Sequence, residues 1–187
     1  MESVIGIGIG IAVVAIIIIL IYNGFVAKRN AVGFAFAGID VQLKKRFDLI
    51  PKLVSAVKAY MQHERETLKR ITALRTQAVA QGTPLSEQLR IYDQLTPDIH
   101  SIIAQVEDYP QLCASGPFQL LQRNLTEVEE QLAAARRAFN AAVMEYNTAT
   151  QVFPSNMFAA LFGFKPTDPF RIADAERVAP QVKGHLP

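Results

Sequence analysis

Hydrophobic and polar residues are distributed unevenly along this chain, and its first segment is the extreme case. From Val4 to Ala27 there is no charged side chain, and Lys28 and Arg29 then follow together. At about 1.5 Å per residue this stretch makes a helix roughly 36 Å long, enough to cross a hydrocarbon core of about 30 Å with some tilt. We therefore interpret residues 1–29 as a transmembrane anchor. Its marker residues are Val4, Gly6, Gly10, Ile21, Lys28 and Arg29.

The charges that flank this segment predict its direction across the membrane. Basic residues follow it, beginning with Lys28 and Arg29, and none precedes it. By the positive-inside rule, we expect the N-terminus outside and the remaining chain in the cytoplasm. A cleaved signal peptide is the alternative, because residues 35–38 contain small side chains spaced like a cleavage site. The basic region that should come before the apolar core of a signal peptide is absent, which favours the uncleaved anchor.

Three glycines in the anchor allow two functional interpretations. A dinucleotide-binding fingerprint fails, because its third glycine would fall at Ile11. A helix-pairing face at Gly6-x-x-x-Gly10 is the other interpretation. Glycine is common in membrane helices, so these residues can equally be ordinary members of one.

Beyond the anchor, apolar residues recur at helical spacing. One long helical pattern extends from Asn30 to about Ala80, and Gly33 is the one residue near its start that could bend the junction with the anchor. Pro51 is predicted to kink or divide this helix, because proline removes a backbone donor and clashes with the preceding turn. The expected buried positions are Leu43, Phe47, Ile50, Val54, Val57, Met61, Leu68 and Ile71.

A second helix is predicted from residue 85 to about residue 108. Gly82 is expected to end the preceding helix, Thr83 to cap the new one and Pro84 to occupy its first turn. Pro97 lies in the middle of this second helix, after a threonine that repeats the capping signal. We expect a kink at Pro97, with a complete break as the alternative.

The third long helix has the most regular pattern and follows a turn-rich loop over residues 109–117. Its apolar residues alternate spacings of three and four, which favours left-handed, coiled-coil-like packing against the first helix or against another subunit. The pattern consists of Phe118, Leu121, Leu125, Val128, Leu132, Ala135, Phe139, Ala142, Tyr146, Ala149 and Phe153.

A short apolar helix is predicted over residues 156–162, with Pro154 ending the long helix and Ser155 capping the short one. Such a short helix cannot span a bilayer. We expect this helix to cover the apolar end of the bundle, and the alternative is an oligomer or membrane contact. The tail, residues 167–187, is rich in proline and is expected to be partly disordered.

These patterns predict an all-α protein in which a single N-terminal transmembrane helix is followed by an antiparallel bundle of three to four helices with coiled-coil-like packing. The expected divisions are the anchor at 1–29, a cytoplasmic bundle at 30–166 and the tail at 167–187. The net charge of +2, from 19 basic and 17 acidic residues, provides no field that would attract nucleic acid. The single cysteine, Cys113, cannot form an internal disulfide, which fits a reducing compartment.

No catalytic constellation emerges from the sequence. His63-Glu64 resembles the start of a zinc-protease motif, but Thr67 stands where its second histidine should be. His100 and His185 have no cysteine or carboxylate at ligand spacing, so we expect no metal site. We also expect no cofactor, and the sequence identifies no small-molecule substrate. Four polar residues beside apolar heptad positions are interpreted as links between helices that fix their register. They are Asp40, Asp48, Asn140 and Asn147.

Several blocks of sequence resemble the LemA family, in the order in which that family has them. The blocks are Ile39–Pro51, Val57–Glu64, Glu107–Leu112, Ala135–Asn147, Phe153–Ser155 and Phe162–Pro166. The resemblance covers nearly the whole chain from Asn23 to Phe170. The motif residues, for which we expect structural roles, are Asp40, Arg46, Asp48, Pro51, His63, Glu64, Tyr109, Pro110, Arg136, Asn140, Tyr146, Asn147, Pro154, Ser155 and Gly163.

This resemblance implies a bacterial, single-pass protein of the inner membrane, with its N-terminus outside and a cytoplasmic helix bundle. It implies no established enzymatic activity and no catalytic residue, and it suggests a link to the cell envelope and to peptide export or presentation. The sequence departs from the family pattern at Lys45, Pro97 and Phe139. We expect a scaffold that contacts the lipid bilayer, further copies of itself and another membrane protein. The alternative is an adaptor in envelope protein or peptide handling.

Overall fold

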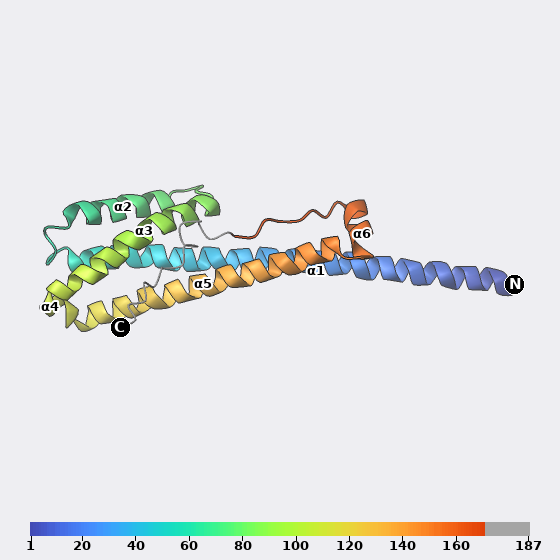
Figure 1. Ribbon diagram of the computed structural model, residues 1–187, viewed down its shortest axis with the longest axis horizontal. Coiled ribbons are helices and arrows are strands. Elements are labelled where there is room, and N and C mark those ends of the chain that lie inside the picture. The colour runs from blue at the N-terminus through green and yellow to red at the C-terminus, as the bar shows by residue number, and fades with distance from the viewer. Residues whose placement is uncertain (171–187) are drawn as a thin grey trace, which may run out of the picture. The chain divides into compact units, whose positions relative to one another are not determined.

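The computed structural model describes residues 1–170, without the side chains of Glu2 and Val4. Every regular element in this range is a helix, which confirms the all-α prediction. The elements are α1 (Glu2–Val57), α2 (Arg65–Ala78), α3 (Leu85–Gln105), the 3₁₀ turn η1 (Val106–Asp108), α4 (Pro110–Cys113), α5 (Gly116–Gln151) and α6 (Ser155–Phe162) (Figure 1). Most of the tail, residues 171–187, lies outside the described residues.

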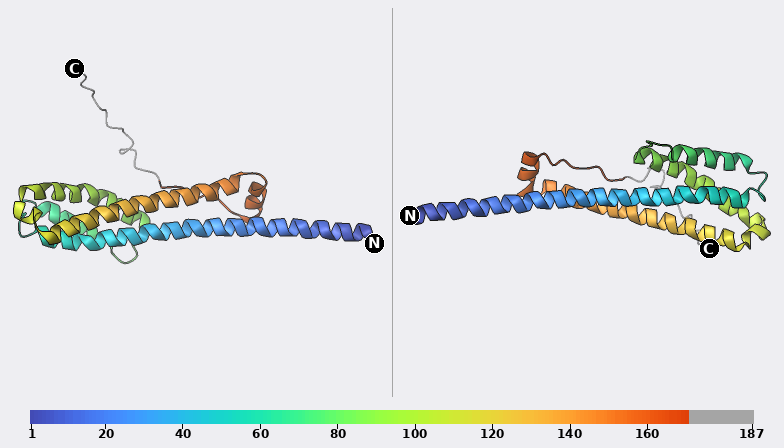
Figure 2. Two further views of the ribbon diagram at one scale, coloured as in Figure 1. Left: turned by 90° about the horizontal axis from the view of Figure 1, so that it is seen from below. Right: turned by 180° about the vertical axis from the view of Figure 1, so that it is seen from behind.

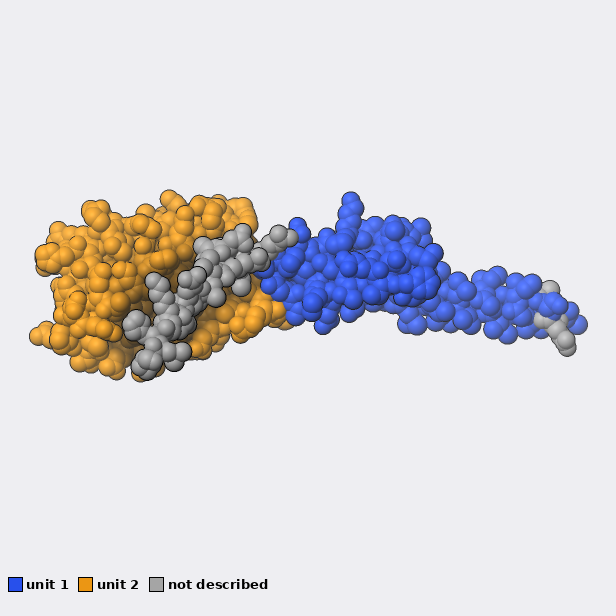
Figure 3. All heavy atoms as spheres, viewed as in Figure 1, with its two compact units in different colours: residues 1–32, 139–187 blue, residues 33–138 orange. Residues whose placement is uncertain are grey.

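The chain forms two compact units, shown in different colours in Figure 3. Unit 1 combines residues 1–32 with the chain from residue 139 onward, and unit 2 comprises residues 33–138. Helices α1 and α5 each contribute to both units. Helix α1 continues without interruption through Gly33, where one unit gives way to the other.

Unit 2 is an antiparallel bundle of four helical segments. The second half of α1, then α2, α3 and the first part of α5 run in alternating directions (Figures 1 and 2). Their facing sides are apolar and almost completely buried, as expected for amphipathic helices that share one core. The most buried apolar residues of this core include Ile39, Leu43, Leu53, Val57, Met61, Ile71 and Ile102.

The first helix of the bundle ends at a different place from the one predicted. Pro51 lies inside α1 without ending it, and the chain instead reverses between Val57 and Arg65. Proline at this position leaves the carbonyl of Phe47 without its helical donor. Arg75 supplies a replacement, because its Nε donates to that carbonyl from α2 at 3.4 Å. The sequence of the reversal contains no glycine or proline that could have announced it.

Pro97 likewise does not break its helix, since α3 is continuous from Leu85 to Gln105. The carbonyl deprived of a donor there belongs to Asp93, which is exposed, so water can solvate it. The fourth bundle segment therefore arises from the reversal before α2 and not from Pro97. The expected loop over residues 109–117 contains the short helix α4, which Pro110 begins.

Two predicted capping residues act on the helix before them instead of the helix after them. The Thr83 hydroxyl donates to the carbonyls of Gln77 and Ala80 at the end of α2, and the Ser155 hydroxyl donates to those of Ala149 and Val152 at the end of α5. The N-cap positions of α3 and α6 are prolines without a side-chain cap bond. Hydroxyl groups can bond to local carbonyls as readily as to amides, and the sequence does not distinguish the two.

Helix α5 confirms most of the heptad prediction. The predicted apolar positions are buried or half-buried from Phe118 to Ala149, with Val143 more deeply buried than Ala142. Phe153 is the exception, because it lies beyond the end of α5 and is 80% exposed.

Candidate functional site

An aromatic cluster joins α1 to the end of the described chain in unit 1. The ring of Tyr22 lies 5.2 Å from that of Phe162 in an edge-on arrangement and 5.8 Å from that of Phe164. Phe25 stacks on Phe164 at 4.8 Å. Apolar residues of α1, α5 and α6 complete this cluster. They are Ile21, Val32, Tyr146, Ala149, Phe158 and Ala159.

The position of α6 in this cluster corrects the expectation that it covers the end of the bundle. Its contacts are with Tyr22 and Phe25 of α1 and Tyr146 of α5, all in unit 1. Gly163 ends α6 in the left-handed conformation, with φ of +74°. That turn lets the Phe164 amide donate to the Ala159 carbonyl at 2.9 Å and directs the Phe164 ring back onto α1.

Two asparagines of α5, Asn140 and Asn147, hold the extended segment that follows α6. The Asn147 side chain donates to the Thr167 carbonyl at 2.8 Å and accepts from the Thr167 amide at 2.9 Å. Asn140 makes the same pair of bonds with Phe170, at 3.0 and 2.8 Å. These two residues, the asparagine pair, therefore bind an extended segment instead of linking helices as predicted.

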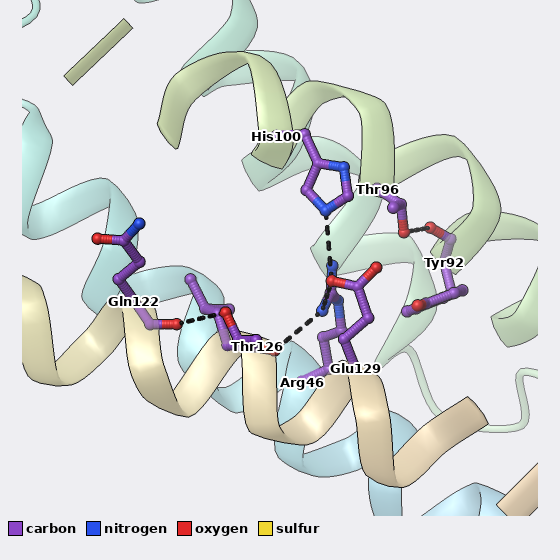
Figure 4. Close-up of polar contacts among 8 residues, drawn as sticks. Arg46, Tyr92, Thr96, His100, Gln122, Thr126 and Glu129 are labelled. Atoms are coloured by element: carbon purple, nitrogen blue, oxygen red, sulfur yellow. Dashed lines mark hydrogen bonds and ion pairs between the residues drawn. The ribbon is translucent and has the colours of Figure 1, made fainter. Parts of the chain in front are cut away.

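A buried arginine forms the polar centre of unit 2 (Figure 4). Arg46 is 1% exposed, and its Nη1 donates to the Leu125 carbonyl and to Glu129, both at 3.3 Å. The same Glu129 oxygen lies 3.3 Å from His100 Nε2. Arg46 thus connects α1 to α5, and Glu129 connects α5 to α3.

The guanidinium group of Arg46 also lies over an aromatic ring. Its Nε and Nη2 have no hydrogen-bond partner among the described residues, but its guanidinium lies 5.1 Å from the centre of the Tyr92 ring. Arg136 approaches the same ring at 5.0 Å and pairs with Asp93 at 3.2 Å. Cation–π attraction between these guanidinium groups and Tyr92 compensates part of the cost of removing Arg46 from water.

A groove of about 760 Å³ lies beside the reversal between α1 and α2 in unit 2. The apolar residues that line it include Val54 and Met61. Its remaining lining contains several cations and no carboxylate; the cationic residues are Lys58, Arg65 and Lys69. The groove can therefore accept an apolar group that carries negative charge.

The other predicted residues are dispersed over both units. Asp40 is exposed and forms no hydrogen bond or ion pair within residues 1–170, whereas Asp48 lies 3.9 Å from Arg75. Within that same range no three His, Cys, Asp or Glu side chains are grouped as metal ligands. The remaining motif residues occupy helix ends and connections. His63 and Glu64 precede α2, Tyr109 and Pro110 begin α4, and Pro154 follows Phe153 through a cis peptide bond.

In the anchor, Lys28 forms an ion pair with Glu145 at 3.6 Å, and Arg29 is exposed. A Cβ added at Gly6 or Gly10 would meet nothing within 4 Å. The side chain of Val4 lies outside the described part of the chain.

Comparison with known proteins identifies a family model that matches this chain. The family model described as "LemA family" matches residues 35–183. The chain belongs to the LemA family. A relative named Protein LemA, from Metamycoplasma hominis, is 22% identical over 156 residues, which cover 83% of this chain and 71% of that protein.

This LemA-family chain is also similar to proteins that are named as magnetosome proteins. Magnetosome protein MamQ of Magnetospirillum gryphiswaldense is 29% identical over 84 residues, and Magnetosome protein MamQ 1 of Paramagnetospirillum magneticum is 30% identical over the same length. Each match covers 43% of this chain and 31% of the relative. The chain therefore corresponds to less than a third of the length of these two proteins.

Sequence reasoning did not assign a site role to four contributing residues, which are Tyr22, Phe25, Tyr92 and Glu129. Glu129 was not singled out because polar residues are normal on the outer face of a long helix. The sequence did contain a signal for the asparagine pair, since Pro166 and Pro169 favour an extended chain, whose backbone groups do not bond to one another as they do in a helix.

Proposed function

We propose that this chain is a membrane-anchored helical scaffold of the bacterial cell envelope, which associates with copies of itself and has no catalytic activity of its own. The observation that carries the proposal is the exposure of α1. Between Ile5 and Leu20, the exposed large apolar side chains of α1 each have 47–66% of their surface accessible to solvent. Each such residue favours insertion at the membrane centre by about 0.3 to 0.6 kcal/mol, so together they favour a bilayer by several kcal/mol.

The direction of insertion follows from charge. Lys28 and Arg29 follow the apolar part of α1, and the positive-inside rule therefore favours an N-terminus outside the inner membrane and unit 2 in the cytoplasm. Similarity to proteins named as magnetosome proteins supports a role at a membrane structure.

Self-association is supported by the glycines of the anchor. The surface around Gly6 and Gly10 is open in this chain, and such small-residue faces allow two membrane helices to approach closely. Substitution of both by isoleucine should therefore weaken association. Substitution of Gly8, which lies on a different side of the helix, is the matched control.

Purification from native membranes tests the proposal. A homogeneous homo-oligomer without other proteins, converted to smaller species by Gly6→Ile with Gly10→Ile but not by Gly8→Ile, would support it. A stoichiometric protease or translocation subunit in the preparation would replace it with the adaptor function.

The groove beside α1 and α2 favours that second candidate, an adaptor in envelope protein or peptide handling. Its lining combines apolar residues with Lys58 and Arg65, which suits an acidic, partly apolar segment of a client, whereas Lys69 is paired with Glu66. Charge reversal at Lys58 and Arg65 should then release the co-purified partner, whereas reversal at Lys52, which does not line this groove, should not.

A further inference from the structure

Helix α6 carries apolar side chains on both of its sides. Ala159 and Phe158 pack into the cluster with Phe25 and Tyr146. Met157 and Leu161, one helical turn apart and on the side opposite Ala159, are 63% and 74% exposed. Phe153, which precedes α6 in the chain, is 80% exposed. A short helix that is apolar all round and open on one side indicates a further interaction partner.

The position at which α6 and Phe164 contact α1 indicates what that partner is. Phe162 and Phe164 contact Tyr22, and Phe164 also contacts Phe25. Tyr22 and Phe25 precede Lys28 by three to six residues, or roughly 5 to 9 Å along the helix axis. This is the depth at which interfacial helices bury their apolar face, about 5 to 10 Å into the boundary between headgroups and acyl chains.

The charges around α6 agree with this depth. No charged residue occurs between Glu145 and Lys165, so the whole of α6 and the residues on either side of it can enter an apolar layer without desolvating a charge. Lys165 follows immediately, and Lys28 and Arg29 end the apolar part of α1. Their side chains can reach outward to lipid phosphates from this depth.

We propose that α6 is a second membrane contact, which lies in the interface of the leaflet on the Lys28 side and buries Phe153, Met157 and Leu161 among the acyl chains. This inference rests on the proposed anchoring by α1. With α1 alone, the chain could rotate freely about the anchor axis. When α6 lies in the same leaflet, its contact with α1 through Phe162 and Tyr22 prevents this rotation.

Site-directed spin labelling of the full chain in phosphatidylethanolamine–phosphatidylglycerol vesicles tests this proposal. Cys113 is first replaced by serine, and a single label is attached at Leu161→Cys. Ile17→Cys reports the anchor, and Leu120→Cys, an exposed leucine of unit 2, reports water. We expect the ratio of oxygen to nickel-chelate accessibility at Leu161 to exceed that at Leu120 several-fold and to approach that at Ile17.

The reference labels separate the possible failures. If Ile17 is protected from nickel and Leu161 is not, the interfacial position of α6 is wrong while anchoring stands. If Ile17 itself is accessible to nickel, anchoring fails and the inference fails with it. If Leu161 is shielded from both reagents and its spectrum sharpens on mixing with unlabelled protein, a second copy covers α6 and the lipid assignment is wrong.

Discussion

The two units differ in how completely each buries its own apolar residues. In unit 2, core residues such as Leu43, Leu53 and Ile102 are inaccessible to solvent. In unit 1, the apolar residues of α1 from Ile5 to Leu20, apart from the half-buried Ile18, and Met157 and Leu161 of α6 remain exposed. The core of unit 2 accounts for its stability in water, because burial of apolar surface is the main favourable term in folding. The exposed apolar surface of unit 1 is the surface that the proposed contact with a bilayer would cover.

Their polar residues differ in a corresponding way. Unit 2 buries the charge of Arg46 and compensates it with Glu129 and Tyr92. Unit 1 uses neutral side chains, Asn140 and Asn147, and bonds them to backbone groups. The comparison implies that the anchor and the bundle respond to different substitutions, and four experiments test this difference.

The largest effect is expected for charges in the anchor. Arginine at both Ile16 and Ile19 should reduce the free energy of insertion by about 6 kcal/mol or more, because each replaces a favourable residue with an unfavourable one. The fraction of protein that resists carbonate extraction should fall sharply. Val41→Arg with Leu120→Arg, at exposed apolar positions of unit 2, is the matched control and should remain in the membrane fraction. If both variants were extracted equally, the anchor and unit 2 would not differ in their response to charged substitutions.

Removal of Arg46 should have the next largest effect and should act on the bundle alone. Arg46→Ala leaves a cavity beside Tyr92 and breaks the links to α5, so we expect a loss of about 2 to 4 kcal/mol in the free energy of unfolding. Arg46→Met, which retains volume, should cost less. Thermal unfolding in detergent followed by circular dichroism measures both. An unchanged midpoint in Arg46→Ala would show that this centre does not stabilise unit 2.

A smaller coupling is expected between Pro51 and Arg75. Arg75→Met should cost about 1 kcal/mol, because the Phe47 carbonyl loses its donor. In a Pro51→Ala background the restored amide can bond that carbonyl, so the same substitution should cost less. A double-mutant cycle on the free energy of unfolding measures the difference. Additive effects would mean that Arg75 does not compensate for the proline.

The smallest effect is expected for Asp48→Ala. The Asp48–Arg75 pair is 3.9 Å long and Asp48 is more than half exposed, so we expect a decrease of at most about 0.5 kcal/mol and a slightly lower thermal midpoint. Asp40→Ala, at an exposed residue with no recorded partner among residues 1–170, is the control. A larger decrease at Asp40 than at Asp48 would contradict the assignment of a register-fixing role to Asp48.

Patterns that depend on local periodicity were predictable from the sequence. The apolar anchor segment, the long helix from Phe118 and the helical class all follow from the spacing of apolar residues, which reports directly on the buried side of a helix. The reversal after Val57 was not predictable, because it contains no residue that stops a helix and depends on how α2 packs back on α1.

The polar contacts were predictable only in part. Arg46 belongs to a recognisable motif, but its partners Tyr92 and Glu129 come from elements more than forty residues away in sequence. The position of α6 was missed for a similar reason, since an apolar helix of eight residues fits several surfaces equally well. Long-range choices of this kind depend on tertiary packing, which local propensity does not encode.

The asparagine pair has a consequence for how the end of the chain can change. Asn140 and Asn147 are seven residues apart on a helix, about 10.5 Å, and Thr167 and Phe170 are three residues apart in an extended segment, about 10 Å. Because only backbone groups are bonded, the match depends on length and not on side-chain identity. The side chain at position 167 can therefore change to any residue that keeps its backbone amide, whereas the ring of Phe170 also packs on Phe139, with ring centres 4.7 Å apart. A one-residue insertion or deletion between positions 167 and 170 would shift the two backbone positions relative to Asn140 and Asn147.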